Sequence, residues 1–246
     1  MYVKKRMEFP NAIEVFEYHS AKYGAPGQSR QPKKEVTPEM IAKRNQYNKE
    51  RLCRWRLRKY FDINDYFVLL TFQKDKRPEN MEEAVQIFGK KFIKKLREIF
   101  RKEGHELRWI RNIEVGTKNA WHIHMVVNRI PDIDLYLRKC WGFGKVVCQL
   151  LYEKGEFAEL AAYLTKSEKT DSRLKEANYS TSRNMPLPDP QVKKYTRWKT
   201  WKDVKVPDGY YLDKNSFHEG INPFTGYKFR LYTLLKMREI NTWNTR

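Results

Sequence analysis

Two histidines separated by one apolar residue stand out among the side chains that could do chemistry. His122 and His124 lie in the segment Trp121–Asn128, whose alternation of apolar and polar residues predicts a β-strand. Because successive side chains of a strand point to opposite faces, both imidazoles should project from one face, about 6–7 Å apart. Two rings at that separation can close on one metal ion. Glu114 stands on the preceding strand-like stretch and offers a hard oxygen ligand.

The register of the predicted hairpin decides whether Glu114 joins the histidines. Odd positions of both strands are mostly apolar, so the even positions should face outward. Paired positions share parity if the loop has three residues, 117–119, and Glu114 then lies opposite His122. A two-residue loop would turn Glu114 away from the histidines. Arg111 is the exception on the apolar face, and we expect it near the edge of that face.

Three candidate ligands on an open face of a basic protein favour a metal site over ordinary surface histidines. Two nitrogens and one carboxylate suit Mn²⁺ or Mg²⁺, with further positions left for water and phosphate. Zn²⁺, Fe²⁺, Co²⁺ and Ni²⁺ are alternative occupants of such a ligand set.

A helical segment further along the chain carries a candidate nucleophile. The helix is predicted over Glu156–Lys166, and its apolar stripe is formed by Phe157, Leu160, Ala161 and Leu164. Tyr163 lies roughly 110° from the centre of that stripe, and Lys166 is its neighbour on the helix surface. A phenol is only about 0.1% ionised at pH 7, so a cation or metal must assist it as a nucleophile. The alternative is a tyrosine at the core margin beside a solvated lysine.

The elements that position these residues predict an α+β fold. Further helices are expected over Thr37–Lys59, Asn80–Lys102 and Ile133–Cys140, and strands over Tyr66–Phe72, Leu107–Val115, Trp121–Asn128 and Lys145–Tyr152. Their order predicts a central antiparallel sheet with helices on one face and the other face at least partly free for a substrate.

The pattern is weaker outside this region. Residues 1–36 lack clear periodicity and are expected to be mostly loop. Strand-like signals return only at Tyr210–Asp213 and Tyr227–Leu235. The predicted organisation is a basic N-terminal extension with a helix (1–60), a core (61–170) and a C-terminal extension (171–246).

Composition predicts a polyanionic partner. The 246 residues carry a formal net charge of +20, so we expect nucleic acid, with a membrane surface as the lesser alternative. No segment reaches roughly 18 continuous apolar residues, and no signal-peptide pattern follows Met1. The three cysteines lack the spacing of a metal knuckle. The segment Trp141–Lys145 lacks the spacing of a P-loop. We therefore expect a cytoplasmic protein with reduced thiols, no membrane association and no nucleotide-driven motor.

Basic and aromatic residues occur together in two places. The second half of the first helix has Trp55 among the basic residues Arg51, Arg54, Arg56, Arg58 and Lys59. We expect these residues, and Lys118 in the hairpin loop, to contact phosphates, although a solvated basic face is the alternative. In the C-terminal part, Tyr195, Trp198 and Trp201 stand among lysines and arginines and either stack on bases or pack the extension.

Together, the strand Leu69–Phe72, Glu114, the pair His122 and His124, and the motif Tyr163-Leu-Thr-Lys166 resemble the HUH endonuclease superfamily. The nearest likeness is to its single-tyrosine rolling-circle replication initiators, and it covers about residues 61–170. The resemblance implies a ferredoxin- or RRM-like sheet on which the two histidines and Glu114 hold a divalent metal. Tyr163 would attack a DNA phosphate with Lys166 as its cationic assistant, leaving a 5′-phosphotyrosine link and a free 3′-hydroxyl.

The implied function is metal-dependent nicking and joining of single-stranded DNA, with Mn²⁺ or Mg²⁺, to initiate rolling-circle replication of a plasmid, phage or mobile element. The implied partners are single-stranded DNA or an origin hairpin, and a host helicase. Ser167 stands where two-tyrosine members carry a second tyrosine. Tyr152 and Tyr179 are rival candidates for the nucleophile. Alternative functions are a relaxase or transposase of the same chemistry, or a non-enzymatic nucleic-acid-binding protein on an RRM-like sheet.

Overall fold

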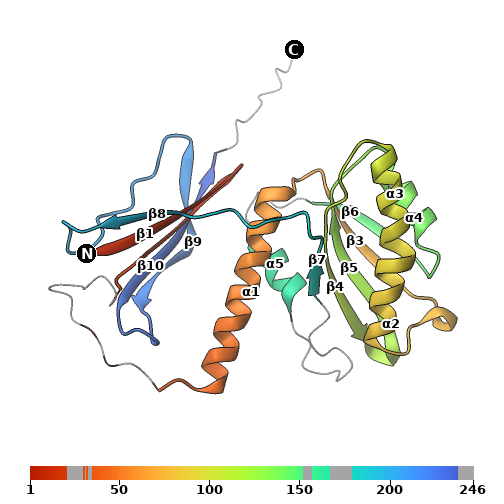
Figure 1. Cartoon of the computed structure of the whole chain (residues 1–246), viewed down its shortest axis with the longest axis horizontal. Helices are drawn as coiled ribbons and strands as arrows, with labels where there is room; N and C mark the ends of the chain where they lie inside the picture. Colours follow the sequence, from red (N-terminus) through yellow and green to blue (C-terminus); the bar gives the residue numbers. More distant parts are fainter. Residues whose placement is uncertain (21–29, 31, 33–34, 152–156, 167–178, 238–246) are drawn as a thin grey trace, which may run out of the picture. The chain divides into compact units, whose positions relative to one another are not determined.

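A computed structural model describes residues 1–20, 30, 32, 35–151, 157–166 and 179–237. The chain forms two compact units (Figure 1). One unit consists of Asn45–Leu187, and the other combines Met1–Arg44 with Pro188–Arg246. The core predicted over 61–170 lies inside the first of these. The two segments predicted as separate extensions contribute strands to one sheet, which is described below.

The unit of residues 45–187 is built on an antiparallel sheet. Its strands are β3 (Tyr66–Thr71), β4 (Trp109–Gly116), β5 (Ala120–Val127), β6 (Val146–Leu150) and β7 (Tyr179–Thr181), in the order β6-β3-β5-β4-β7. The predicted α+β class with a central antiparallel sheet is confirmed. The predicted hairpin is also confirmed, with β4 and β5 paired from Trp109 opposite Val127 to Gly116 opposite Ala120.

One face of this sheet carries a long helical segment and α4 (Ile133–Cys140). The segment runs through α2 (Met81–Gln86), a π-helical stretch (Ile87–Ile93) and α3 (Lys94–Lys102). Apolar side chains of these helices pack with the odd positions of β4 and β5 in one buried cluster, which includes Phe88, Phe92, Trp121, Ile123 and Trp141. Arg111 is buried on this face with its guanidinium 5.3 Å from the ring centre of Phe88, and not at the predicted edge.

The second face of the sheet carries α5 (Ala158–Thr165) and the part of α1 (Pro38–Tyr60) that follows Arg44. Ile110 and Val126 share this face with the even-numbered histidines, and both belong to a buried cluster with Leu57 of α1 and Leu164 of α5. The prediction of helices on one face was therefore incomplete. Two apolar residues at otherwise polar positions of the hairpin attract a second helical layer, which leaves the histidine end of this face as the site.

The other unit is a second five-stranded antiparallel sheet. Its strands are β1 (Tyr2–Phe9), β2 (Ala12–Tyr18), β8 (Gln191–Tyr195), β9 (Tyr210–Ile221) and β10 (Lys228–Lys236), in the order β8-β1-β2-β10-β9. The expectation of loop over residues 1–36 was wrong for β1 and β2. Charged residues obscure the alternation in these strands, and the buried Glu17 is satisfied by Arg230, whose Nε donates to its Oε2 at 2.9 Å. A partner more than 200 residues away leaves no local signal.

No helix in the described part of the chain combines the length and apolar character that crossing a membrane requires.

Candidate functional site

The β4–β5 hairpin brings Glu114, His122 and His124 together. Its loop is the three-residue turn Thr117–Asn119, in which Lys118 and Asn119 each adopt a left-handed φ of 58°. Glu114 pairs with His122 across the strands, and Asn112 pairs with His124. The predicted loop length and register are therefore confirmed, because alternation on both strands allowed only this pairing to bury both apolar faces.

The three side chains form a group that could bind a metal ion. Glu114 Oε2 lies 3.2 Å from His122 Nε2 and 3.4 Å from His124 Nε2. One ligand atom from each residue lies within 4.8 Å of the other two. Nitrogen and oxygen ligands about 2.1 Å from one ion are themselves roughly 3–4 Å apart, so little movement is needed to close this group on a cation.

The carboxylate of Glu114 is prepared to act as an anionic ligand. Burial would raise its pKa, but hydrogen bonds and positive charge from His122 and His124 outweigh burial and hold the pKa at about 2. The side-chain amide of Asn112 donates from Nδ2 to Glu114 Oε1 at 3.2 Å and is itself fully buried. This bond engages one carboxylate oxygen and leaves Oε2 toward the histidines.

The imidazole of His122 is oriented by the backbone. Its Nδ1 lies 3.0 Å from the carbonyl oxygen of Ala120 and can donate to it, which leaves Nε2 as the nitrogen for a metal. His124 is more deeply buried than His122, with 9% of its side chain exposed against 24%. The ring of Phe67 on β3 stacks on His124 at 5.7 Å between centroids, with 15° between the ring planes.

Tyr163 reaches the same site from α5. Its hydroxyl oxygen lies 2.8 Å from His124 Nε2, and the residue is 38% exposed. The rings of Tyr163 and His124 meet edge to face at 4.9 Å, and Phe67 contacts Tyr163 edge-on at 6.2 Å. Strands β3, β4 and β5 and helix α5 thus converge on one point, where a phenol stands beside a metal-ligand set and remains open to a substrate.

Lys166 lies just beyond the end of α5. The helix ends at Thr165, and the backbone of Lys166 leaves helical geometry with φ −52° and ψ 127°. Its side chain is exposed, and its backbone N–H donates to the carbonyl of Tyr163 at 3.3 Å. Lys166 therefore stays in the turn that follows Tyr163, although not on the regular helix surface that its spacing predicts.

The two rival tyrosines differ from Tyr163. Tyr152 lies outside the described residues. Tyr179 starts β7 opposite Asn112, and burial raises its pKa far above that of an ordinary phenol, with Cys53 adding to the rise. Tyr179 is thus a poorer nucleophile in its present surroundings than an exposed phenol would be.

The basic residues of α1 are largely engaged within their own unit. Arg58 is buried, at 6% exposure, so the structure argues against its predicted contact with DNA. Arg56 Nε donates to the Met185 carbonyl at 3.3 Å, and Lys59 Nζ donates to the Pro186 carbonyl at 3.5 Å. Arg51 bonds Asn48 and lies 5.2 Å above the Trp55 ring, and Arg54 is half-buried. Packing of α1 therefore uses much of the charge that sequence suggested was free.

The remaining predicted DNA contacts differ in exposure. Lys118 is exposed in the hairpin turn. Trp198 is 47% exposed, with Lys202 Nζ 4.1 Å from its ring centre. Trp201 is buried at 8% exposure, stacks near His19 and donates from Nε1 to Glu219 at 3.3 Å. Of the alternatives considered for these tryptophans, Trp201 fits packing and Trp198 remains open to a ligand.

Asn112 and Phe67 support the site but were not singled out from sequence. Asn112 has the same parity as Glu114, which was the available signal. Phe67 gave none, because an apolar residue in an apolar strand carries no mark of its neighbours.

With this geometry in place, the comparison with protein families is informative. Residues 65–168 match the model of a family described as replication-associated protein ORF2. The match spans the whole β3-to-α5 region, including the metal-ligand group and Tyr163. It is consistent with a rolling-circle replication initiator. Searches of curated proteins and of solved structures found no match.

Proposed function

We propose that this protein is a metal-dependent enzyme that nicks and rejoins single-stranded DNA to initiate rolling-circle replication. The observation that carries the proposal is the 2.8 Å separation of the Tyr163 hydroxyl from His124 Nε2, inside the group formed with Glu114 and His122. A sheet that only bound nucleic acid would need exposed aromatic rings. It would not need a buried carboxylate and two imidazoles within reach of one cation.

The residues fit a divalent metal. Glu114 Oε2 and the Nε2 atoms of His122 and His124 would hold it, with Mn²⁺ or Mg²⁺ as the proposed ion. A metal bound there supplies Lewis-acid polarisation of the scissile phosphate and neutralises charge that develops on it. Asn112 keeps the carboxylate oriented through Oε1, and Phe67 fixes the plane of the His124 ring.

Tyr163 is the proposed nucleophile. Its oxygen forms a bond to phosphorus as the bond from phosphorus to the 3′ oxygen breaks, and the departing oxygen takes up a proton to become a 3′-hydroxyl. The energy of the phosphodiester is kept in the tyrosine link. Attack by a 3′-hydroxyl on that link therefore rejoins DNA without ATP. Exposure of Tyr163 admits the phosphate, and Lys166 offers a cation in the following turn.

The substrate is proposed to be single-stranded or extruded from an origin hairpin. Helices α1 and α5 cover part of the sheet face on which the site lies, so a backbone phosphate must enter at the histidine end. An unpaired strand can bend into such a site more easily than a duplex, whose stiffness extends over roughly 150 base pairs.

The test is covalent capture. A fluorescent single-stranded library of random sequence is incubated with the protein and Mn²⁺, and adducts that survive denaturation are resolved on a gel. We expect an adduct that requires metal and disappears in Tyr163→Phe, while Tyr179→Phe still forms it. Persistence of the adduct in Tyr163→Phe would move the nucleophile elsewhere. Binding of DNA and metal without any adduct would favour a non-enzymatic binding protein.

A further inference from the structure

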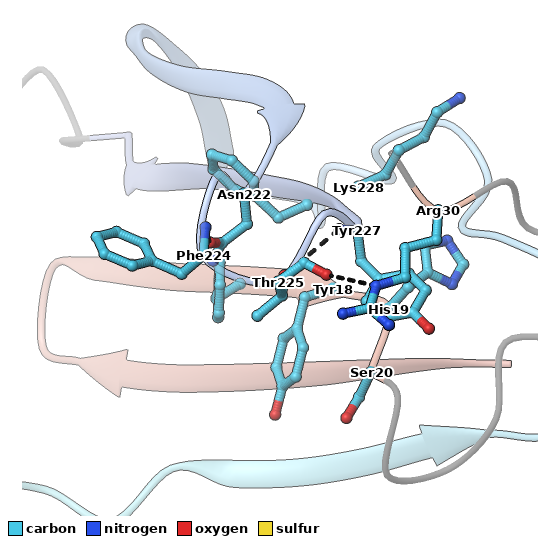
Figure 2. Close-up of a pocket in the computed structure, with 11 residues that line it drawn as sticks. Tyr18, His19, Ser20, Arg30, Asn222, Phe224, Thr225, Tyr227 and Lys228 are labelled. Carbon is cyan, nitrogen blue, oxygen red and sulfur yellow. Dashed lines mark hydrogen bonds between the residues drawn. The ribbon is translucent and has the colours of Figure 1, made fainter. Parts of the chain in front are cut away.

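A hollow in the unit of residues 1–44 and 188–246 takes no part in the proposed nicking step. Its volume is about 320 Å³, at the lower end of the roughly 300–1,000 Å³ typical of ligand sites. Figure 2 shows how β2, the turn between β9 and β10 and the separate residue Arg30 surround it. The lining residues that matter are Phe16, Tyr18, Phe224, Tyr227, Arg30 and Lys228.

The aromatic rings of the hollow are not used by the hydrophobic core of the sheet. Ile13 and Val15 of β2 pack into that core with residues of β10. Phe16 and Tyr18 remain outside the core and only half-buried. Their rings stack at 4.9 Å, and Phe229 lies 6.1 Å from Phe16. These rings thus offer flat apolar surface to a ligand.

Cations border these rings. Arg30 Nε donates to the Thr225 carbonyl at 3.2 Å, and its guanidinium lies 5.5 Å from the ring centre of Tyr227 (Figure 2). Lys228 is exposed at the start of β10. Among the described residues that line the hollow, none is acidic. Residues 1–44 and 188–246 together contain 21 Lys and Arg against 11 Asp and Glu, so the surrounding field also favours an anion.

The wall contributed by the β9–β10 turn is preformed. Asn222 accepts from the backbone N–H of Phe224 through Oδ1 at 2.9 Å, and its carbonyl accepts from Gly226 N at 2.7 Å. The turn closes with Asn222 N donating to the Tyr227 carbonyl at 2.9 Å. Gly226 has φ +72°, which few side chains tolerate. A ligand would therefore not have to order this turn.

We propose that the hollow binds an unpaired nucleotide of single-stranded DNA, with a base against the aromatic rings and a phosphate near Arg30 and Lys228. Flat apolar rings bordered by cations are the pattern by which proteins hold single strands without reading sequence. A duplex covers its base faces and an acidic peptide lacks them, so neither would use the rings. The proposal rests on the proposed function only for the choice of DNA as the nucleic acid.

The experiment measures binding by fluorescence anisotropy of a labelled 20-nucleotide oligothymidylate to the full chain. EDTA and a Tyr163→Phe background remove any contribution from metal or covalent capture. We expect Tyr227→Ala and Phe224→Ala each to weaken binding roughly 5-fold or more, in line with base stacking on aromatic side chains. Tyr227→Phe, which keeps the ring, should bind like the parent. Arg30→Ala should weaken binding and lower its dependence on salt.

Matched controls lie on the same sheet. Tyr211→Ala removes a 40% exposed ring of β9, and Lys214→Ala removes an exposed charge of β9; both should leave binding unchanged. Circular dichroism verifies that each variant folds. An oligomer of abasic sugars with equal charge should bind more weakly than oligothymidylate to the parent protein and equally to Tyr227→Ala.

Three results would overturn the proposal. These are unchanged affinity in both aromatic variants, equal affinity for duplex and single strands, or displacement of the oligonucleotide by polyglutamate as efficient as by unlabelled oligothymidylate. Failure of the nicking assay would leave these measurements intact. Conversely, hollow variants in the wild-type background should still form the covalent adduct at saturating DNA, so the two proposals can fail separately.

Discussion

The hydroxyl oxygen of Tyr163 and Nε2 of His124 lie 2.8 Å apart, so the candidate nucleophile occupies the nitrogen that a metal would also use. One lone pair cannot both accept a hydrogen bond from the phenol and bind an ion. Metal binding at His124 must therefore release Tyr163 from this hydrogen bond. A competition of this kind couples the loading of the site to the freeing of the phenol.

The first prediction follows from this competition. Tyr163→Phe should bind Mn²⁺ about 2- to 10-fold more tightly than the parent, because it removes a hydrogen bond of about 0.5–1.5 kcal/mol that opposes coordination. Isothermal titration calorimetry gives the affinities. Tyr136→Phe is the matched control, since that hydroxyl bonds Glu103. Equal or weaker Mn²⁺ binding by Tyr163→Phe would contradict the competition.

A second prediction concerns Asn112 as a positioning residue. Asn112→Ala should weaken Mn²⁺ binding about 10- to 100-fold, the usual cost of losing a partner that orients a metal ligand. Asn128→Ala is the control. Its amide oxygen accepts from Arg108 N at 2.7 Å, so its loss should lower stability without changing metal affinity. Similar metal binding in the two variants would assign Asn112 a structural role only.

A third prediction uses the low pKa of Glu114. A carboxyl whose pKa falls from 4.5 to about 2 on folding stabilises the folded state fully above pH 4.5, and this contribution is lost as pH falls toward 2. Its upper limit is about 3 kcal/mol. Glu114→Gln should therefore lower the urea midpoint of the metal-free protein more at pH 6 than at pH 3. Equal effects at the two pH values would show that the carboxylate is not stabilised in the folded protein.

A fourth prediction concerns Lys166. Lys166→Gln should slow adduct formation about 10-fold, because a nearby cation favours ionised phenol by about one pKa unit or more. Mn²⁺ affinity should stay unchanged, since Lys166 is not among the ligands. Lys166→Arg should restore most of the rate. A rate that is insensitive to Lys166→Gln would remove this residue from the proposed mechanism.

Sequence was most informative where one local pattern constrained two strands at once. Odd-position apolar residues on both sides of Thr117–Asn119 required a single register, and that register placed Glu114 opposite His122. The position of Tyr163 relative to His124 was beyond such a pattern. It depends on how α5 packs against Ile110 and Val126, which are contacts between distant segments.

The second sheet was missed for the same physical reason in stronger form. β2 pairs with β1 on one side and with β10 on the other, more than 200 residues later. Charges at Lys4, Lys5 and Glu17 obscure alternation, and the compensation for Glu17 comes from Arg230. Sequence periodicity reports local amphipathicity, whereas these strands are stabilised by a distant ion pair and distant neighbours.

The pairing of β2 with β10 also sets an order of events during synthesis. Residues 45–187 can be complete while the ribosome has yet to make β8, β9 and β10, so the β1–β2 hairpin must wait with unpaired edges. Edges of this kind invite pairing with other chains, and pairings so distant in sequence form slowly. A chain that stops shortly after Leu187 would keep every residue of the metal-ligand group and Tyr163, yet expose that hairpin permanently. We therefore expect premature termination to cause aggregation before it affects the chemistry of the site.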